Sequence, residues 1–280
     1  IDRLEAQLSL FRSSSEIAHL NARAAREPVR VTPSLFALLQ HAQQLNAESD
    51  GAFDITVAPL LRCWGFLGGS GHLPAPEDLA AARAKVGMHL VQLEPKDFTV
   101  RFLRPGVMLD LGAIGKGYAV ERATELLREL GVCSALLHGG TSTVYGLGQP
   151  PEAEFWKVAI SPPQGSSGSR TNPDPIATVA LKDEALSVSA VWGKFFEAEG
   201  QTFGHILDPR TGQAANRALL SAVVLPSATE TDALSTALLT LGPEGHARIA
   251  SLRPAIRTLV VAKAAGQWTV RSQGIEGLRL

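Results

Sequence analysis

The chain has 280 residues, with 26 Lys and Arg against 27 Asp and Glu and a formal net charge of -1 at pH 7. Because 45% of the residues are hydrophobic and 19% are charged, the chain can bury a sizeable core, which excludes global disorder. The balanced charge argues against a dedicated nucleic-acid binder, which needs a basic excess to contact phosphates. No apolar run approaches the roughly 20 residues that span a bilayer as a helix. We expect a globular protein that binds no nucleic acid.

The chain opens without Met, and Leu4, Leu8 and Phe11 follow helical spacing. An opening inside an amphipathic helix favours a trimmed or processed chain, so we expect any signal peptide or membrane anchor to lie upstream. Cys63 and Cys133 show neither metal-ligand nor disulfide-framework spacing, and we interpret them as small buried hydrophobic residues.

The next elements are predicted from periodicity and capping signals in chain order. A helix is predicted over 33–48, where Thr32 precedes Pro33 as the N-cap. Then follow strands over 89–93 and 98–103, a helix over 113–130, and short strands over 135–137, 157–160 and 176–181. The Gly-, Ser- and Pro-rich stretch 162–175 is typical of an exposed, mobile loop. A strand over 219–225, a helix over 228–241 and strands over 257–262 and 267–271 complete the chain. Irregular interleaving of helices and strands predicts a mixed α+β fold rather than a doubly wound sheet.

The segment LDLGAIGKGYAVERA leads into the helix predicted over 113–130. It contains an acidic residue, a turn of small residues and then a lysine. Backbone N–H groups at a helix start, together with Lys116, favour an anion such as phosphate. The spacing matches neither a P-loop nor a dinucleotide fingerprint. An ordinary Gly-rich turn remains the alternative.

The segment PSATETDALSTAL begins the helix predicted over 228–241. Ser227 and Glu230 match a capping box. Asp232 and Thr236 are four residues apart and share a face, with Ser235 beside them, and such oxygen ligands suit Mg²⁺. The alternative is a polar flank in which the Thr236 hydroxyl bonds back to its own helix.

His205 and Asp208 lie in the segment GHILDPRTG, where the histidine is a candidate general base or a structural residue before a turn. Trp64 and Phe66 end the segment ESDGAFDITVAPLLRCWGF. These two rings indicate either aromatic core or a wall on which a planar ring stacks.

Taken together, the segments LNARAAREPVRVTP, GAFDITVAPLLRCWGF, LDLGAIGKGYAVERA, LLHGGTSTVYGLG, HILDPRTG and SATETDALSTALLTLGPEG occur in the order found in one family. Over about 1–262 the chain resembles the FAD:protein FMN transferases, the ApbE family. The resemblance implies a single α+β domain over 1–280 of the ApbE, T-fold-like type, with mainly antiparallel sheets and packed helices. By the same resemblance, we expect the family's first strand and the helix before it to be absent from the printed residues.

The resemblance implies an enzyme that uses Mg²⁺ to transfer FMN from FAD to a Ser or Thr hydroxyl of a target protein, with release of AMP. By matching positions, His205 is the expected base that activates the acceptor hydroxyl. The expected FAD contacts are Ala52, Phe53, Asp54, Asp110, Lys116 and Ile206. The expected metal ligands are the carbonyl of Ala113 and the side chains of Asp232, Ser235 and Thr236.

Two positions depart from the family's pattern. Thr141 follows Gly139 and Gly140 where relatives often carry an acid, and Ala190 stands where they usually carry Gly. These departures keep two alternatives open: a FAD pyrophosphatase giving FMN and AMP, and a catalytically impaired flavin-binding protein. The family works outside the cytoplasmic membrane, exported or lipid-anchored. The resemblance therefore implies a periplasmic or extracytoplasmic location, with membrane contact only through an anchor upstream of these residues.

Overall fold

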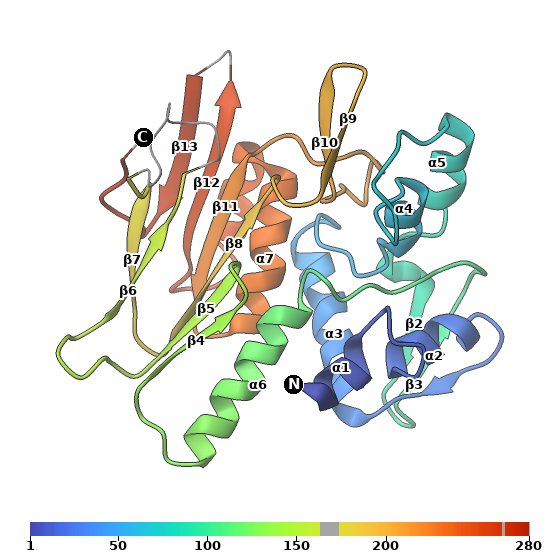
Figure 1. The fold of residues 1–280 in the computed structure, drawn as a ribbon. Helices are drawn as coiled ribbons and strands as arrows, with labels where there is room; N and C mark the ends of the chain where they lie inside the picture. Colours follow the sequence, from blue (N-terminus) through green and yellow to red (C-terminus); the bar gives the residue numbers. More distant parts are fainter. Residues whose placement is uncertain (163–173, 265–266, 280) are drawn as a thin grey trace. The chain divides into compact units, whose positions relative to one another are not determined.

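A computed structural model describes residues 1–162, 174–264 and 267–279 (Figure 1). The chain divides into two compact units. The first comprises Ile1–Ala113 with Gly193–Ala215, and the second comprises Ile114–Trp192 with Asn216–Leu280. Most of the loop predicted at 162–175 lies outside the described residues. Among the helices described, none has the length and apolar character needed to cross a membrane.

The first unit combines helices with two small antiparallel sheets (Figure 1). Its elements are α1 (Asp2–Leu8), α2 (Glu16–Arg23), β1 (Val29–Arg30), α3 (Pro33–Glu48), α4 (Ala58–Cys63), α5 (Pro76–Arg83), the 3₁₀ turn η1 (Met88–Leu90), β2 (Val91–Glu94), β3 (Thr99–Phe102), β9 (Phe195–Ala198) and β10 (Gln201–Gly204). One sheet has the order β1-β3-β2, and β9 with β10 forms a hairpin. Helix α3 has the predicted bounds, and its apolar stripe, which includes Leu35, Leu39 and Leu45, is fully buried.

The second unit is built on a six-stranded sheet of order β13-β12-β11-β8-β5-β4. Its elements are α6 (Gly115–Glu129), β4 (Ala135–Gly139), β5 (Thr143–Leu147), β6 (Trp156–Ile160), β7 (Ala177–Leu181), β8 (Glu184–Ala190), β11 (Leu220–Leu225), α7 (Ala228–Leu241), the 3₁₀ turn η2 (Pro243–Gly245), α8 (His246–Ala250), β12 (Arg257–Ala264) and β13 (Gln267–Gln273). A separate hairpin pairs β6 with β7. Every strand pair in the described residues is antiparallel, which confirms the predicted α+β class with antiparallel sheets.

Strand β11 is buried on both faces because it lies between two layers. Leu220, Ala222 and Val224 pack in one core cluster with apolar residues of the β6–β7 hairpin. Since successive side chains of a strand alternate between faces, Ser221 points to the other side, where its hydroxyl donates to the carbonyl of Ser235 in α7 at 2.6 Å. The strand therefore supports α7 directly.

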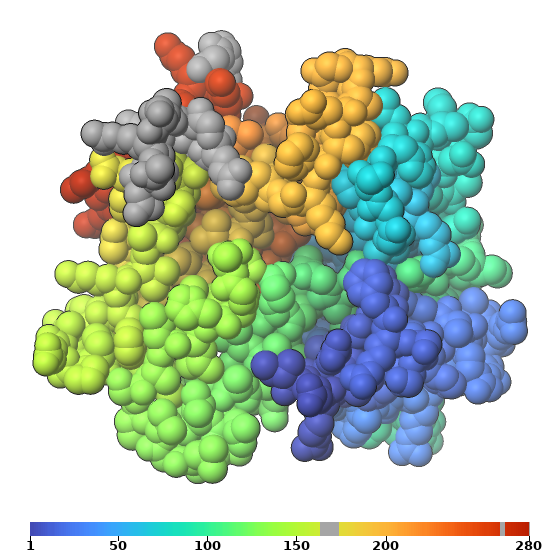
Figure 2. Space-filling model, in the orientation of Figure 1, coloured from blue at the N-terminus to red at the C-terminus, as the bar shows by residue number. Residues whose placement is uncertain are grey.

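Helix α6 is amphipathic along its length. Gly117, Val120 and Thr124 are buried at helical spacing, and Val120 packs against β5. The outer face of α6 reaches the surface (green in Figure 2). Leu126 in the helix and Leu130, which follows its last residue, are exposed. The C-terminal half of the helix is also attached to the unit, since Leu127 packs against the same core cluster and Arg128 donates to the Tyr145 hydroxyl and the Asp183 carboxylate.

Several predicted elements differ from the structure. The strand predicted at 89–93 begins at Val91, after the turn η1. The helix predicted at 113–130 begins at Gly115, so Ala113 precedes it. Phe11 lies beyond the end of α1 and is exposed. Cys133 is exposed and Cys63 half-buried, so the interpretation of both as buried residues was wrong. Helices α2, α4 and α5, strands β5 and β8 and the β9–β10 hairpin were not predicted from the sequence.

Candidate functional site

Helix α7 carries polar side chains although it is buried on nearly all sides. The Ser227 hydroxyl accepts from the N–H of Glu230 at 3.2 Å, which confirms the predicted helix start. Asp232, one turn further, is only 3% exposed. A buried carboxylate needs partners, since an unpaired charge away from water is costly. The partners of Asp232 come from α6.

Gly117 and Lys116, in the first turn of α6, both contact Asp232. One carboxylate oxygen accepts from the N–H of Gly117 at 2.9 Å, and the other lies 3.8 Å from Nζ of Lys116. The Gly117 N–H is one of the helix-terminal donors that have no partner within α6 itself, and Asp232 supplies the acceptor. Burial raises the pKa of Asp232, and Lys116 and the Gly117 N–H oppose that rise.

The approach of α6 to α7 requires glycine at position 117. A Cβ there would lie 2.1 Å from the carbonyl oxygen of Ala228 and 2.7 Å from Cβ of Asp232. No side chain fits between the two backbones, so the short contact from Gly117 to Asp232 depends on the missing methyl group.

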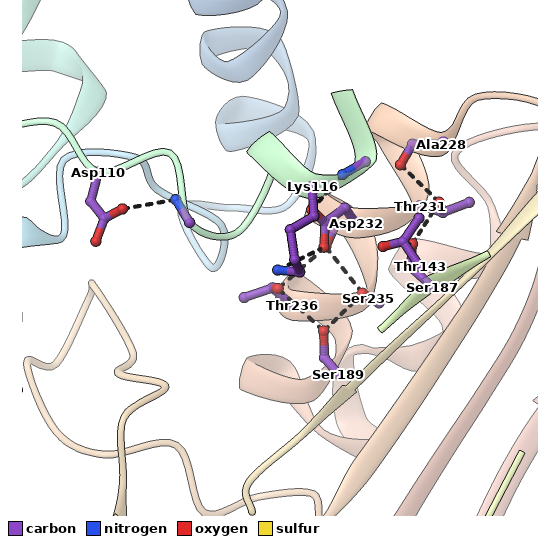
Figure 3. A network of polar contacts seen from close by, with 12 residues as sticks. Asp110, Lys116, Thr143, Ser187, Ser189, Ala228, Thr231, Asp232, Ser235 and Thr236 are labelled. Atoms are coloured by element: carbon purple, nitrogen blue, oxygen red, sulfur yellow. Dashed lines mark hydrogen bonds and ion pairs between the residues drawn. The ribbon is translucent and has the colours of Figure 1, made fainter. Parts of the chain in front are cut away.

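Three hydroxyl groups lie beside Asp232, at the positions labelled in Figure 3. Ser235 and Thr236 donate to the carbonyl of Asp232 at 3.0 and 3.2 Å. The back-bond that was the structural alternative for Thr236 is therefore present. Ser189 of β8 contacts the same two hydroxyls, at 2.8 Å to Ser235 and 3.3 Å to Thr236. Lys116, Asp232, Ser189, Ser235 and Thr236 form what we call the α7 cluster.

The α7 cluster fits a hard divalent cation by the chemistry of its donors. Its acceptor atoms are all oxygens, one carboxylate and three hydroxyls, as Mg²⁺ requires when water and substrate phosphates complete the shell. The described residues hold no group of three or more His, Cys, Asp or Glu side chains that could bind a metal ion, so this candidate site depends on a single carboxylate and on hydroxyl oxygens.

In the first unit, Asp110 and Ala113 belong to the loop before α6. The Asp110 carboxylate accepts from the N–H of Gly112 at 2.8 Å, and its own N–H donates to the carbonyl of Ile55 at 2.7 Å. These bonds fix the backbone that leads to Ala113, which is half-buried.

Ala52, Phe53 and Asp54 follow a tight turn and are all buried. Asp50 and Gly51 in that turn have φ of 57° and 73°, the left-handed region that Gly adopts easily and Asp tolerates. The Asp54 carboxylate accepts from the N–H of Thr56 at 2.7 Å and from its hydroxyl at 2.5 Å.

Asn46 reaches the second oxygen of Asp54 at 3.1 Å. Burial raises the pKa of Asp54, while these hydrogen bonds lower it. Its carboxylate thus organises its own loop, and the FAD contact predicted for it stays a prediction.

His205 directly follows the β9–β10 hairpin, and Ile206 is half-buried beside it. Nδ1 of His205 lies 3.1 Å from the carbonyl oxygen of Lys194. Because a carbonyl only accepts, Nδ1 donates in this contact, and in the neutral ring the lone pair is then on Nε2. Gly193 lies close by, and a Cβ there would be 3.2 Å from Cε1 of His205. The geometry suits a base that acts through Nε2.

The rings near His205 form an aromatic core. Phe66 meets the histidine ring edge to face at 6.5 Å between centroids, and Phe196 and Phe203 stack at 5.3 Å. Trp64 is 1% exposed and donates its indole N–H to the carbonyl of Gly212 at 2.8 Å. Of the two interpretations of Trp64 and Phe66, the structure supports aromatic core.

Asp208 is engaged in its own turn. Its carboxylate is buried and bonds the guanidinium of Arg210 through two N–H groups, at 2.8 and 2.7 Å. Asp208 therefore shapes the turn that follows His205, and its paired carboxylate is poorly suited to act as a base.

The structure gathers four of the predicted residues, Lys116, Asp232, Ser235 and Thr236, in the second unit. Ala52, Phe53, Asp54, Asp110, Ala113, His205 and Ile206 belong to the first unit. Ser189, whose hydroxyl belongs to the α7 cluster, was not predicted as a site residue. The signal that could have found it is the alternation of Ser187 and Ser189 in LSVSA, which puts two hydroxyls on one face of a strand.

Comparison with known proteins decides the family. The model of the ApbE family matches residues 1–260. The chain belongs to the ApbE family. A relative from Treponema pallidum named FAD:protein FMN transferase is 31% identical over 274 residues, which cover 93% of this chain and 74% of the relative.

Solved ApbE structures share the fold. The apo form of the Pseudomonas stutzeri flavinyl transferase ApbE matches with a TM-score of 0.84 and 32% identity, over 98% of this chain and 83% of that one. The Thermotoga maritima ApbE protein also matches with a TM-score of 0.84, at 28% identity over 92% of this chain and 82% of that one. The α+β architecture inferred from the sequence is thus that of the ApbE family.

Proposed function

We propose that this protein transfers FMN from FAD to a Ser or Thr hydroxyl of a target protein, releases AMP, and depends on Mg²⁺. The observation that carries the proposal is the α7 cluster, in which the Asp232 carboxylate and three hydroxyls lie beside Lys116 at the start of α6. Relatives of similar sequence bear the name FAD:protein FMN transferase.

Asp232, Ser235 and Thr236, with the carbonyl of Ala113, are the groups that would hold Mg²⁺. Bound there, the metal would neutralise charge on the FAD diphosphate. Lys116 adds a second positive charge, and the N–H groups in the first turn of α6 favour the same anion. Phosphoryl transfer requires mainly positioning and charge neutralisation, which these groups of the chain supply.

His205 would take the proton of the acceptor hydroxyl on Nε2. The acceptor oxygen forms a bond to the phosphorus of the FMN half, the pyrophosphate bond breaks, and AMP leaves with the electron pair of that bond. The Lys194 carbonyl holds Nδ1 and so keeps the ring in the tautomer that this step requires. Ala52, Phe53, Asp54, Asp110 and Ile206 are the proposed FAD contacts.

One reaction mixture tests the proposal against its alternatives. The protein is incubated with FAD, Mg²⁺ and a Thr-containing acceptor domain, and AMP, free FMN and a fluorescent protein band are measured. AMP with a fluorescent acceptor band supports transfer. AMP with free FMN and no labelled band supports a pyrophosphatase, and bound flavin without AMP supports an impaired flavin-binding protein.

Three substitutions separate the proposed roles. His205→Gln should slow transfer about 10²–10⁴-fold with FAD affinity nearly unchanged, since a base acts only in the reaction. Lys116→Met should weaken FAD binding by about 1–3 kcal/mol, the range for charge-assisted hydrogen bonds. Asp232→Ala should lose Mg²⁺-dependent turnover.

His19→Gln, on the exposed side of α2, is the matched control and should leave transfer unchanged. Transfer by His205→Gln at the wild-type rate would remove the base from the proposal. A rate of Asp232→Ala equal to wild type at limiting Mg²⁺ would remove the metal site.

A further inference from the structure

Each of the helices α6 and α7 holds the N-terminus of the other with a carboxylate. Asp232 of α7 accepts from the N–H of Gly117 in the first turn of α6, at 2.9 Å. In return, one oxygen of Glu121 in α6 accepts from the hydroxyl of Ser227 at 2.7 Å and from the N–H of Thr229 at 2.8 Å, at the start of α7. The two contacts run in opposite directions across one helix pair.

These contacts fix two things about α7 relative to α6: its rotation about its own axis and its position along that axis. Gly117 and Glu121 are four residues apart, so they lie on one face of α6, a single turn from each other. The first contact depends on the absence of a side chain, and the second on a side chain long enough to reach the next helix. Because Thr229 and Asp232 are three residues apart in α7, holding one fixes the place of the other.

We propose that Glu121 is a positioning residue for the metal site, one that sets Asp232 and Thr236 in place relative to Lys116. The proposal rests on the proposed function, because it takes the α7 cluster as the Mg²⁺ site. Among the residues that the structure describes, the Glu121 carboxylate bonds Ser227 and Thr229 at the start of α7, and it acts on the metal site through Asp232. The Ser227 hydroxyl already caps α7 by accepting from the Glu230 N–H. Its additional bond to Glu121 links the N-terminus of α7 to helix α6.

Glu125 provides a matched control on the same helix. It lies one turn beyond Glu121 and forms an ion pair with Arg122, its neighbour in α6. Both partners of that pair are largely exposed. Glu125→Ala therefore removes the same carboxylate from the same helix without touching the start of α7.

The test measures Mg²⁺ binding without turnover. Thermal unfolding is followed as a function of MgCl₂ concentration in the absence of FAD, and the dependence of Tm on concentration gives an apparent Kd. Glu121→Ala should bind Mg²⁺ about tenfold more weakly than wild type, the lower end of the effect for residues that orient metal ligands. Glu125→Ala should bind as wild type.

Conservative variants distinguish positioning from a general loss of stability. Glu121→Gln keeps an acceptor at the same reach and should recover most of the affinity, whereas Glu121→Asp is too short and should behave like the alanine variant. If Glu121→Ala does not fold, the Gln and Asp variants decide. Equal Mg²⁺ affinity of the Asp variant and wild type would overturn the inference.

The failure of this inference differs from failure of the proposed function. If wild type binds Mg²⁺ and transfers FMN while every Glu121 variant keeps wild-type affinity, only the positioning role is wrong. If wild type shows neither Mg²⁺ stabilisation nor FMN transfer, both are wrong.

Discussion

Replacing Gly117 by alanine would place a methyl group where the backbone of α7 now lies. The new Cβ would be 2.1 Å from the carbonyl oxygen of Ala228, whereas close carbon–oxygen contacts in proteins are at about 3.3 Å. The helices must therefore separate by about 1 Å, because the obstacle is helix backbone and not the end of a flexible side chain. Asp232 moves with α7, and its 2.9 Å bond to the Gly117 N–H stretches or breaks.

Two opposing terms set the cost. Overpacking of a tight contact costs about 1–3 kcal/mol, and rigid backbone puts this site in the upper half of that range. Alanine in a helix recovers at most about 1 kcal/mol relative to glycine. We expect Gly117→Ala to lower the free energy of unfolding by about 1–2 kcal/mol, so sterics outweigh propensity.

Urea unfolding at equilibrium measures this difference. Ala123→Gly, in the middle of the same helix, is the control, because it reports the Gly–Ala difference in α6 without the contact to α7. Mg²⁺ stabilisation of Gly117→Ala should fall along with its stability. A Gly117→Ala protein as stable as wild type, or more stable, would refute the close approach of the two helices.

Three further predictions concern other contacts. Thr229 has a buried hydroxyl without a hydrogen-bond partner in the described structure, so Thr229→Val should leave stability unchanged or raise it by up to about 1 kcal/mol in urea unfolding. A loss of stability of more than about 1 kcal/mol would show that the hydroxyl has a hydrogen-bond partner. Burial, and then Arg271, lowers the pKa of His246, so stability should fall as pH drops below about 6.5, where the unfolded chain takes up the proton first. His246→Gln should flatten this slope between pH 7 and 5, and an unaltered slope would contradict the assignment. Arg210→Met removes the charged partner of the buried Asp208 carboxylate, to which the N–H of residue 210 still donates, and should cost about 1–3 kcal/mol of stability. A neutral result in the same unfolding assay would argue against the pair.

Local patterns predicted the parts of the fold that depend on neighbours in sequence. Helix α3 has the predicted bounds because Pro33 begins it and one apolar stripe is continuous to its end. Thr32 precedes the helix as predicted, but its side chain makes no capping hydrogen bond and its hydroxyl donates to Glu16. The start of α7 at Ser227 was predicted from the capping box, since the cap and the N–H that it accepts are three residues apart. Asp232 and Thr236 lie on one face for the same reason, as helical spacing alone places them there.

The partners of those residues could not be predicted from spacing. Gly117 and Asp232 are separated by 115 residues, and Ser189 and Ser235 by 46. In a capping box, the side chain of the third helical residue, here Glu230, is expected to bond back to the N-cap residue. The Glu230 carboxylate instead pairs with Arg253, and the Ser227 hydroxyl donates to Glu121 of another helix. The sequence pattern of α7 gives no sign of these two tertiary partners.

The hydroxyl groups beneath α7 explain why a polar carboxylate can be held inside this unit. Thr143, Ser187 and Thr231 form a buried chain, with contacts of 3.0 and 2.8 Å, that ends on the Ala228 carbonyl (Figure 3). Apolar residues would fill this layer at lower desolvation cost, since a buried hydroxyl is tolerated only when it is bonded. Each bonded hydroxyl, however, fixes a direction as well as a distance, and a connected set of them restricts α7 to one rotation on the sheet. An apolar layer would allow α7 to slide or turn by small amounts, and the Asp232 carboxylate would move with it. The polar layer therefore fixes the position of the Asp232 carboxylate, whereas an apolar layer would stabilise the helix more and position it less well.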